Sequence, residues 1–210
     1  MGSVSPVTAP IRLLLADDQA LVRGALATLL GLEADLEVVA QVGSGDEVVA
    51  SAREHAVDVA LLDVEMPGTD GIQAAAALRA AVPACRVLIV TTFGRPGYLR
   101  RALDAGASGF VVKDTPADRL ADAVRRVHAG LRVVDPELAV ESLAVGTSPL
   151  TDRERSVLLE ASRGGTVADV ARATHLSEGT VRNYLSAAIG KTSARTRAEA
   201  VRIAQDNGWL

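Results

Sequence analysis

The sequence predicts two domains, an α/β domain with a doubly wound, five-stranded parallel sheet and then a small all-α domain. Three observations predict them. Apolar segments alternate with helical patterns five times before about residue 130, and no strand pattern follows residue 149. The composition is 49% hydrophobic but only 2% aromatic, so the core is aliphatic. An aliphatic core suits helices stacked on a buried parallel sheet.

Five short apolar runs are the expected strands. They are Ile11–Ala16, Leu36–Val42, Val57–Leu62, Arg86–Thr91 and Ser108–Val112. A helical pattern follows each of them, at residues 20–32, 44–54, 71–81, 96–105 and 115–129. Ser44 and Glu47 have the spacing of a capping box, while Thr115 and Pro116 suit the N-cap and first position of the last of these helices.

The pattern loosens after the fifth helix. Residues 131–148 are expected to form a linker with one short helix that ends near Val145. The expected boundaries are therefore 10–130 for the α/β domain and 149–210 for the helical domain, after a flexible lead of nine residues. Four short helices are expected in the helical domain, at about residues 152–163, 167–173, 178–190 and 197–207.

Charge and cysteine content exclude several classes of protein. Residues 1–148 carry 13 basic and 19 acidic side chains, whereas residues 149–210 carry 9 and 7, so only the second part is net positive. This asymmetry permits nucleic-acid binding by the C-terminal domain alone. The single cysteine, Cys85, excludes an internal disulfide and fits a reducing compartment. No run is apolar enough for a membrane span or signal peptide, so we expect a soluble, cytoplasmic protein without a membrane partner.

Polar residues gather where the apolar strands end. Asp17 and Asp18 follow the first strand, Asp63 follows the third, Thr91 ends the fourth and Lys113 follows the fifth. The functional crevice of a doubly wound fold lies at this edge of the sheet. Either early aspartate alone could simply cap the next helix, but all five positions together indicate a site.

Three carboxylates at one edge require a cation, and hard oxygen ligands suit Mg²⁺. A carboxylate can also act as a nucleophile towards a phosphoryl group. A metal ion, a lysine ammonium and a threonine hydroxyl would then neutralise and orient the transferred group. One of the only two lysines in the chain, Lys113, stands at this site.

The segments LADD ending at Asp18, DVEMPGTDG from Asp63 and GASGFVVK ending at Lys113 resemble the receiver domain of response regulators, which has a flavodoxin-like fold. The resemblance spans residues 10–130. It implies that Asp63 is the phospho-acceptor and that Lys113 pairs with the phosphate. It also implies the remaining roles, namely Mg²⁺ ligation by Asp18, by Asp17 through water and by the backbone carbonyl of Glu65, and a switch pair of Thr91 and Phe110.

Two positions depart from the common receiver pattern. Asp114 rather than proline follows the lysine, as in the NarL branch of the family, and the switch position holds Phe110 rather than tyrosine. A signalling step through a tyrosine hydroxyl is therefore absent at this position.

The C-terminal domain contains two helical patterns, at 166–174 and 177–190, that are separated by a tight turn at His175-Leu176. In the second, Val181, Leu185 and Ala188 form an inward stripe. A recognition helix presents polar side chains to bases in the major groove, and other side chains meet phosphates. The candidate base contacts are Arg182, Asn183 and Ser186, and the candidate phosphate contacts are Thr180, Lys191 and Arg195. An ordinary helical bundle fits the spacing equally well.

The residues themselves favour the helix-turn-helix. LTDRER from Leu150 and VARATHLSEGTVRNY from Val170 resemble the LuxR/NarL-type DNA-binding domain, and SEGTVRNYLS is most similar to DesR-like regulators. Gly190 and Thr192 depart from the family pattern, in which an apolar residue is usual at the second position.

We therefore expect a DNA-binding transcriptional response regulator of a two-component system. A sensor histidine kinase would phosphorylate Asp63, and phosphorylation would promote homodimerisation and binding to double-stranded promoter DNA. The chain would catalyse only its own phosphoryl transfer and dephosphorylation. One alternative is a Mg²⁺-dependent phosphohydrolase, in which Glu65, two residues after the nucleophile, would be the acid/base. A regulator that works without phosphorylation is the other.

Overall fold

The computed structural model describes residues 9–92, 96–136, 138–140 and 148–210. Two compact units are present, one that contains the sheet and comprises residues 9–92 and 101–136, and one that is helical and also includes residues 96–100. Most of the expected N-terminal lead, and the expected linker helix beyond residue 140, lie outside the described residues. Within the described part of the chain, none of the helices combines the length and apolar character needed to span a bilayer.

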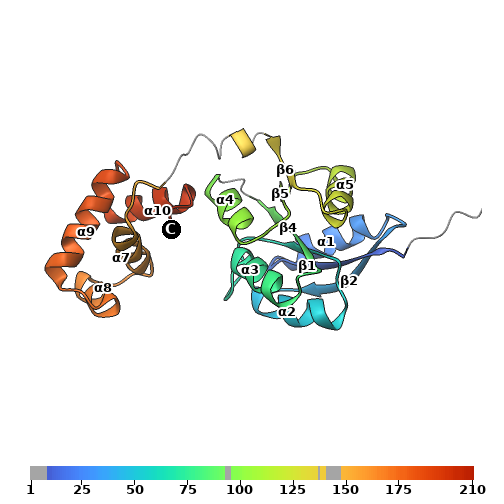
Figure 1. The fold of residues 1–210 in the computed structure, drawn as a ribbon, viewed down its shortest axis with the longest axis horizontal. Coiled ribbons are helices and arrows are strands. Elements are labelled where there is room, and N and C mark those ends of the chain that lie inside the picture. The colour runs from blue at the N-terminus through green and yellow to red at the C-terminus, as the bar shows by residue number, and fades with distance from the viewer. Residues whose placement is uncertain (1–8, 93–95, 137, 141–147) are drawn as a thin grey trace, which may run out of the picture. The chain divides into compact units, whose positions relative to one another are not determined.

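The first unit contains a fully parallel sheet in the order β2-β1-β3-β4-β5-β6 (Figure 1). Its strands are β1 (Ile11–Ala16), β2 (Leu36–Val42), β3 (Val59–Leu62), β4 (Arg86–Thr91), β5 (Gly109–Val112) and β6 (Val133–Val134). The five predicted strands are confirmed, although β3 starts two residues later than expected and β5 one. Most of their residues are buried, which explains why they read as continuous apolar runs.

The sixth strand corrects the predicted linker. Val133 donates its backbone N–H to the Ser108 carbonyl at 3.1 Å, and its side chain is buried in the core of the first unit. In register, Val133 lies beside Gly109 and Val134 beside Phe110. A two-residue strand has no detectable periodicity, so the sequence could not reveal it.

Five helices alternate with the strands of the sheet, α1 (Ala20–Leu30), α2 (Gly45–Glu54), α3 (Gly71–Ala81), α4 (Pro96–Asp104) and α5 (Ala117–His128). The face that carries Leu13, Leu61 and Val90 packs against α1 and α5, and α2 and α3 lie together on the other side (Figure 1). Ser44 is the N-cap of α2, as predicted, but it accepts the Asp46 N–H and the predicted capping box with Glu47 is wrong. The predicted cap of α5 is also wrong, because Pro116 rather than Thr115 is its N-cap.

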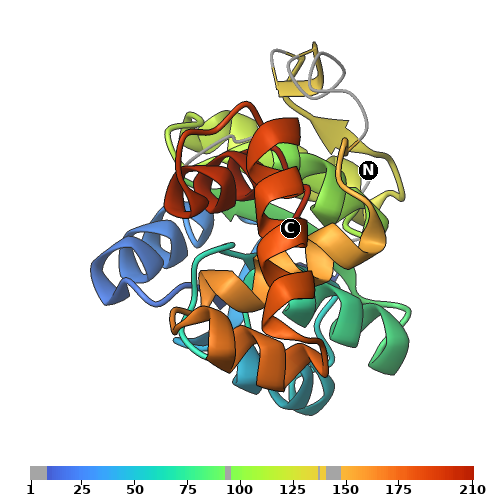
Figure 2. The same cartoon turned by 90° about the vertical axis from the view of Figure 1, so that its left-hand side faces the viewer.

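The second unit contains α7 (Asp152–Ser162), α8 (Val167–Thr174), α9 (Glu178–Lys191) and α10 (Arg197–Asp206). Figure 2 shows α9 as a long, nearly vertical helix. Two capping boxes start α7 and α8, with Thr151 and Thr166 as their N-caps. His175, in the left-handed conformation with φ +55°, ends α8 and makes the predicted tight turn.

Candidate functional sites

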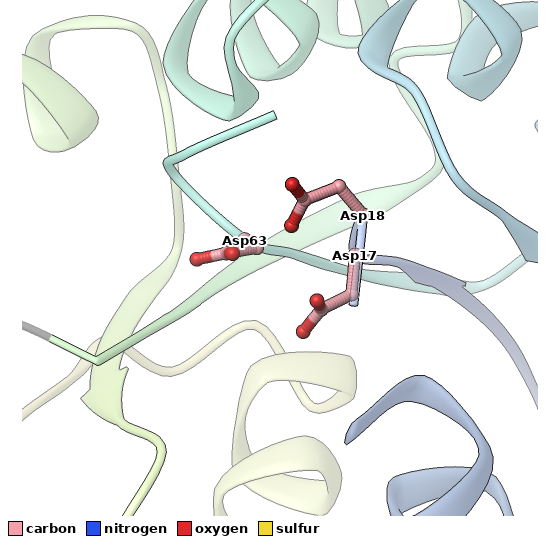
Figure 3. Close-up of side chains that lie close together, drawn as sticks. All are labelled: Asp17, Asp18 and Asp63. Atoms are coloured by element: carbon pink, nitrogen blue, oxygen red, sulfur yellow. The ribbon is translucent and has the colours of Figure 1, made fainter. Parts of the chain in front are cut away.

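A cluster of carboxylates lies at the carboxyl edge of the sheet. The carboxylate oxygens of Asp17, Asp18 and Asp63 lie within 4.8 Å of one another (Figure 3). Ala16 and Leu62 are neighbours in register, and Asp63 donates its N–H to the Ala16 carbonyl at 2.8 Å. Pairing of β1 with β3 therefore places the two strand ends side by side. Asp17 and Asp63 are buried, and Asp18 is exposed.

Lys113 supplies the positive charge at this cluster. Its Nζ lies 2.7 Å from Asp17 Oδ2 and 2.9 Å from Asp63 Oδ2. Its backbone N–H donates to the Thr91 carbonyl at 2.8 Å, so the end of β4 positions it. The cluster contains three carboxylates and one ammonium, so its net charge is negative when the carboxylates are ionised. A further cation would be attracted to it.

The electrostatics follow from burial and from this ammonium. Burial raises the pKa of Asp63, and the hydrogen bond from Lys113 only partly opposes that effect. Burial alone would lower the pKa of Lys113, but the hydrogen bonds to Asp17 and Asp63 outweigh it and raise that pKa. Lys113 is therefore a firmly held cation beside a carboxylate that is more basic than usual, and a basic carboxylate is a better nucleophile.

Both predicted switch residues are buried at paired strands of the sheet. Thr91 ends β4 with a side chain that is only 1% exposed, and it lies beside Val112 in register. Phe110 is fully buried in β5, beside Ile89 on one edge and Val134 on the other. The aromatic ring therefore packs inward, as an apolar residue should.

The backbone after Asp63 is held by Gly71. This glycine ends the DVEMPGTDG motif, and the sequence did not reveal its packing role. A Cβ on Gly71 would lie 1.8 Å from the Asp63 carbonyl oxygen and 2.8 Å from its carbonyl carbon. Gly71 also donates its N–H to the Val64 carbonyl at 3.1 Å. The start of α3 therefore lies directly against the backbone of the candidate phospho-acceptor.

In the second unit, helix α9 has one apolar face, which is buried, and one polar face, which is exposed. Val181, Leu185 and Ala188 are buried in its core, as the stripe predicted. The candidate DNA contacts Arg182, Asn183, Ser186, Lys191 and Arg195 are exposed, and Thr180 is half-buried. Arg182 donates to Glu178 at 2.6 Å within the helix. This ion pair is exposed, so Arg182 can leave Glu178 for another anion at little cost in free energy.

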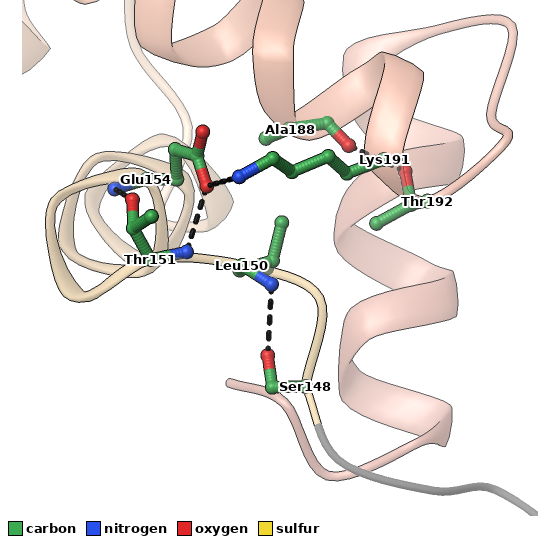
Figure 4. A network of polar contacts seen from close by, with 7 residues as sticks. All are labelled: Ser148, Leu150, Thr151, Glu154, Ala188, Lys191 and Thr192. Atoms are coloured by element: carbon green, nitrogen blue, oxygen red, sulfur yellow. Dashed lines mark hydrogen bonds and ion pairs between the residues drawn. The ribbon is translucent and has the colours of Figure 1, made fainter.

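Lys191 has a partner inside the protein. It donates from Nζ to Glu154 Oε2 at 2.8 Å, and that oxygen also accepts the Thr151 N–H at 2.7 Å (Figure 4). This hydrogen bond from Lys191 is the main reason that the pKa of Glu154 is lowered. The pair ties the last residue of α9 to the first turn of α7.

The two unusual residues at the end of α9 fit their surroundings. Thr192 is buried, and its hydroxyl donates to the Ala188 carbonyl at 2.8 Å, so its polar group is satisfied. Gly190 is exposed, and a Cβ there would meet no atom within 4 Å. Neither residue leaves a defect in the core of the second unit.

Two family models match the chain. The response regulator receiver domain matches residues 13–125, which is more than half of the chain, and the luxR family of bacterial regulatory proteins matches residues 148–204. The chain belongs to the LuxR-type response regulators. It is accordingly a DNA-binding response regulator of a two-component system and not a classical enzyme. The fold class and the family predicted from the sequence are both confirmed.

Individual relatives cover almost the whole regulator. The transcriptional regulatory protein DesR of Bacillus subtilis is 40% identical over 200 residues, which are 95% of this chain and 99% of DesR. Among solved structures, the response regulator ChrA of a heme-sensing two-component system is 30% identical, with a TM-score of 0.59 over 97% of this chain and all of that one. An RcsB–DNA complex, at 20% identity and a TM-score of 0.67 over 94% and 98% of the two chains, shows the likeness of fold alone.

Glu154→Gln should destabilise the second unit of the regulator by about 1–2 kcal/mol, because it weakens the charged hydrogen bond between the buried Glu154 carboxylate and the exposed Lys191. The lowered pKa means that Glu154 stabilises this unit when ionised. That contribution is complete above the ordinary pKa of 4.5 and is lost as the pH falls through the lower folded value. Fluorescence of Trp209, the only tryptophan, which packs on the core of the second unit, would follow unfolding at pH 7 and pH 3.

The matched control is Glu160→Gln, on the same helix, whose carboxylate pairs with the exposed Arg163. This control should unfold within about 0.5 kcal/mol of the wild type. Equal stability of Glu154→Gln and the wild type at pH 7 would show that the Lys191 contact contributes nothing.

Proposed function

We propose that phosphorylation of Asp63 by a sensor histidine kinase switches this regulator between states with different affinities for promoter DNA. The observation that supports it best is the geometry of Asp63, a buried carboxylate within 4.8 Å of two others and 2.9 Å from Lys113. Such a group is activated by its surroundings and lies beside a cation that can donate a hydrogen bond to a phosphoryl oxygen.

The donor set fits Mg²⁺. Three carboxylates converge around a single ammonium, and hard oxygen ligands are those that this ion prefers. Asp18 and Asp63 would hold it directly, Asp17 through water, and Glu65 through its backbone carbonyl. When bound, Mg²⁺ supplies charge neutralisation for the phosphoryl oxygens.

The remaining chemistry belongs to the side chains of the protein. An oxygen of Asp63 attacks phosphorus, and a new O–P bond forms as the P–N bond to the kinase histidine breaks. Lys113 then donates a hydrogen bond to a phosphoryl oxygen, and the Thr91 hydroxyl donates another. In a separate hydrolysis step, water attacks the phosphorus of the aspartyl phosphate, the O–P bond to Asp63 breaks and inorganic phosphate leaves, so the chain acts only on its own phosphoryl group.

Phosphohydrolase activity towards other substrates is disfavoured. It would require Glu65 as an acid/base, but the Glu65 side chain is exposed and its carboxylate is outside the cluster of Asp17, Asp18 and Asp63. Regulation without phosphorylation is disfavoured too, because Asp17, Asp18, Asp63 and Lys113 are all present and lie close together.

DNA recognition is assigned to the polar face of α9. Arg182, Asn183 and Ser186 would contact base edges, while Thr180, Lys191 and Arg195 would meet phosphates. An ammonium has three donors, and Lys191 uses one of them on Glu154. It can therefore bind a phosphate without breaking that pair.

Phosphorylation is further proposed to promote homodimerisation. Association buries apolar surface, and such surface is available on the first unit. Leu21 and Leu29 of α1 are 87% and 43% exposed, and Leu32, just after it, is 77% exposed. The cytoplasmic location expected from the sequence stays a prediction.

Asp63→Asn should abolish labelling by acetyl phosphate in the presence of Mg²⁺, because the amide is not a nucleophile towards phosphorus. The wild type should gain one phosphoryl group by intact mass and elute from gel filtration as a dimer, while the variant stays monomeric. The control is Asp104→Asn, an exposed acid at the end of α4, which should be labelled normally. A phosphoryl group on Asp63→Asn would refute the assignment.

Asn183→Ala should weaken binding to the operator, found by footprinting, by about 1–3 kcal/mol, since a bidentate base contact is worth that much. Binding to unrelated DNA should not change, because base contacts contribute only to specific binding. Fluorescence anisotropy at fixed salt measures both affinities. Arg163→Gln, after the end of α7, is the control, and an equal loss on operator and unrelated DNA would make Asn183 a non-specific contact.

A further inference from the structure

The loop of residues 64–70, between Asp63 and α3, is held by the start of α2. Thr69 donates its hydroxyl to Asp46 Oδ1, and Ser44 Oγ lies 3.4 Å from both the Pro67 carbonyl oxygen and Asp46 Oδ2, to one of which it donates. Between them, Gly68 lies so close to Asp46 that a Cβ there would be 2.5 Å from Oδ2. Three consecutive loop residues therefore contact the first turn of α2.

The backbone of α2 packs against the same loop. A Cβ on Gly45 would lie 2.1 Å from the Thr69 carbonyl oxygen, so these two backbones are in direct contact. Ser44 caps α2 by accepting the Asp46 N–H at 3.2 Å, which fixes the turn that carries Asp46. The side chain of Asp46 thus connects the capped first turn of α2 to the loop of residues 64–70.

The other end of the loop is also fixed, because Gly71 packs on the Asp63 carbonyl. Glu65, whose carbonyl is a proposed Mg²⁺ ligand, lies between Asp63 and the segment 67–69 that contacts α2. Since the loop is only seven residues long, holding residues 67–71 restricts the positions that residue 65 can reach. A backbone carbonyl can serve as a metal ligand only when the backbone is positioned in this way.

We propose that Asp46, acting with Thr69, is a positioning residue for the Asp63 site. It fixes the loop so that the Glu65 carbonyl is set for Mg²⁺. Its carboxylate is outside the cluster of Asp17, Asp18 and Asp63, so it acts through the loop and not as a ligand. This inference rests on the proposed function, because it presumes Mg²⁺ binding and phosphorylation at that cluster.

Four variants of the full chain separate the hydrogen bond from the charge. Asp46→Ala and Thr69→Val each remove the bond, whereas Asp46→Asn keeps the Oδ1 acceptor and loses only the charge. Glu47→Ala is the matched control, because Glu47 is an exposed acid in the same first turn of α2. Titration calorimetry with MgCl₂ gives the Kd, and labelling by acetyl phosphate gives the initial rate.

Asp46→Ala and Thr69→Val should each raise the Kd for Mg²⁺ about five-fold, the usual effect of one hydrogen bond. Combining them should add little, since they remove the same bond. The labelling rate at saturating Mg²⁺ should be unchanged, which a general loss of folding would not produce. Asp46→Asn and Glu47→Ala should bind Mg²⁺ like the wild type.

Wild-type Mg²⁺ affinity in Asp46→Ala and Thr69→Val would overturn the positioning role and leave the proposed function intact. Equal weakening by Asp46→Asn and Glu47→Ala would also overturn it, because the effect would then be one of charge. A wild-type chain that neither binds Mg²⁺ nor gains a phosphoryl group on Asp63 would instead refute the proposed function, and the inference with it.

Discussion

Gly71→Ala is expected to destabilise the first unit by about 3 kcal/mol, at the upper end of the usual cost of overpacking, and to prevent labelling of Asp63. The added Cβ would lie 1.8 Å from the Asp63 carbonyl oxygen and 3.3 Å from the Val64 Cα. These are backbone atoms, so no side-chain rotation relieves the clash. Either α3 or the Asp63 backbone must move. Thermal unfolding by circular dichroism and labelling by acetyl phosphate measure the two effects.

The control is Gly24→Ala in α1, where a Cβ would meet nothing within 4 Å. Alanine at an exposed helix position should stabilise the unit by about 0.5–1 kcal/mol, because it restricts the unfolded chain. If Gly71→Ala lowers the free energy of unfolding and Gly24→Ala raises it, contact with Asp63, and not helix propensity, determines the effect of alanine at position 71. Normal stability and labelling of Gly71→Ala would disprove the close packing.

Lys113→Met should destabilise the first unit by about 3 kcal/mol in the absence of Mg²⁺, because removing one partner of a buried ion pair leaves unpaired charges. The carboxylates of Asp17 and Asp63 are 4% and 3% exposed and would then repel each other. Added Mg²⁺ should raise the melting temperature of the variant more than that of the wild type, since a bound cation replaces the missing charge. Calorimetric scans with and without Mg²⁺ measure the difference.

Arg119→Met provides the comparison for Lys113→Met. Arg119 is an exposed cation in α5, and its loss should change stability by no more than about 0.5 kcal/mol. Lys113→Met with wild-type stability in chelator would mean that the carboxylates do not depend on the ammonium.

The fold could be predicted where burial requires a recognisable pattern of apolar residues in the sequence. Strands that are mostly buried, such as β1 and β4, are largely apolar, and polar residues mark where they end, Asp17 just after β1 and Thr91 as the last residue of β4, so their ends were found correctly. The cap of α5 was missed because Thr115 and Pro116 both favour a helix start, and local preference could not separate them. Interactions outside the element decide such one-residue choices.

The central site was predictable for a different reason. The doubly wound topology brings the ends of β1, β3 and β5 to one edge, so Asp17, Asp63 and Lys113 had to be neighbours. The contacts of Asp46 with Thr69 and of Glu154 with Lys191 join positions 23 and 37 residues apart. No rule of periodicity or topology relates these positions, so their pairing required coordinates.

The short strand β6 also affects how regulators of this kind can be recombined. A hybrid joined at residue 130 would take residue 133 from another protein, and a side chain that does not fit the site of the buried Val133 would move this backbone away from the Ser108 carbonyl. The freed edge of β5, beside Phe110, would then offer unpaired backbone groups to any other strand, and exposed edges favour aggregation. Exchanging output domains between relatives should therefore succeed only when the junction lies beyond Pro136, so that the receiver keeps its own last strand.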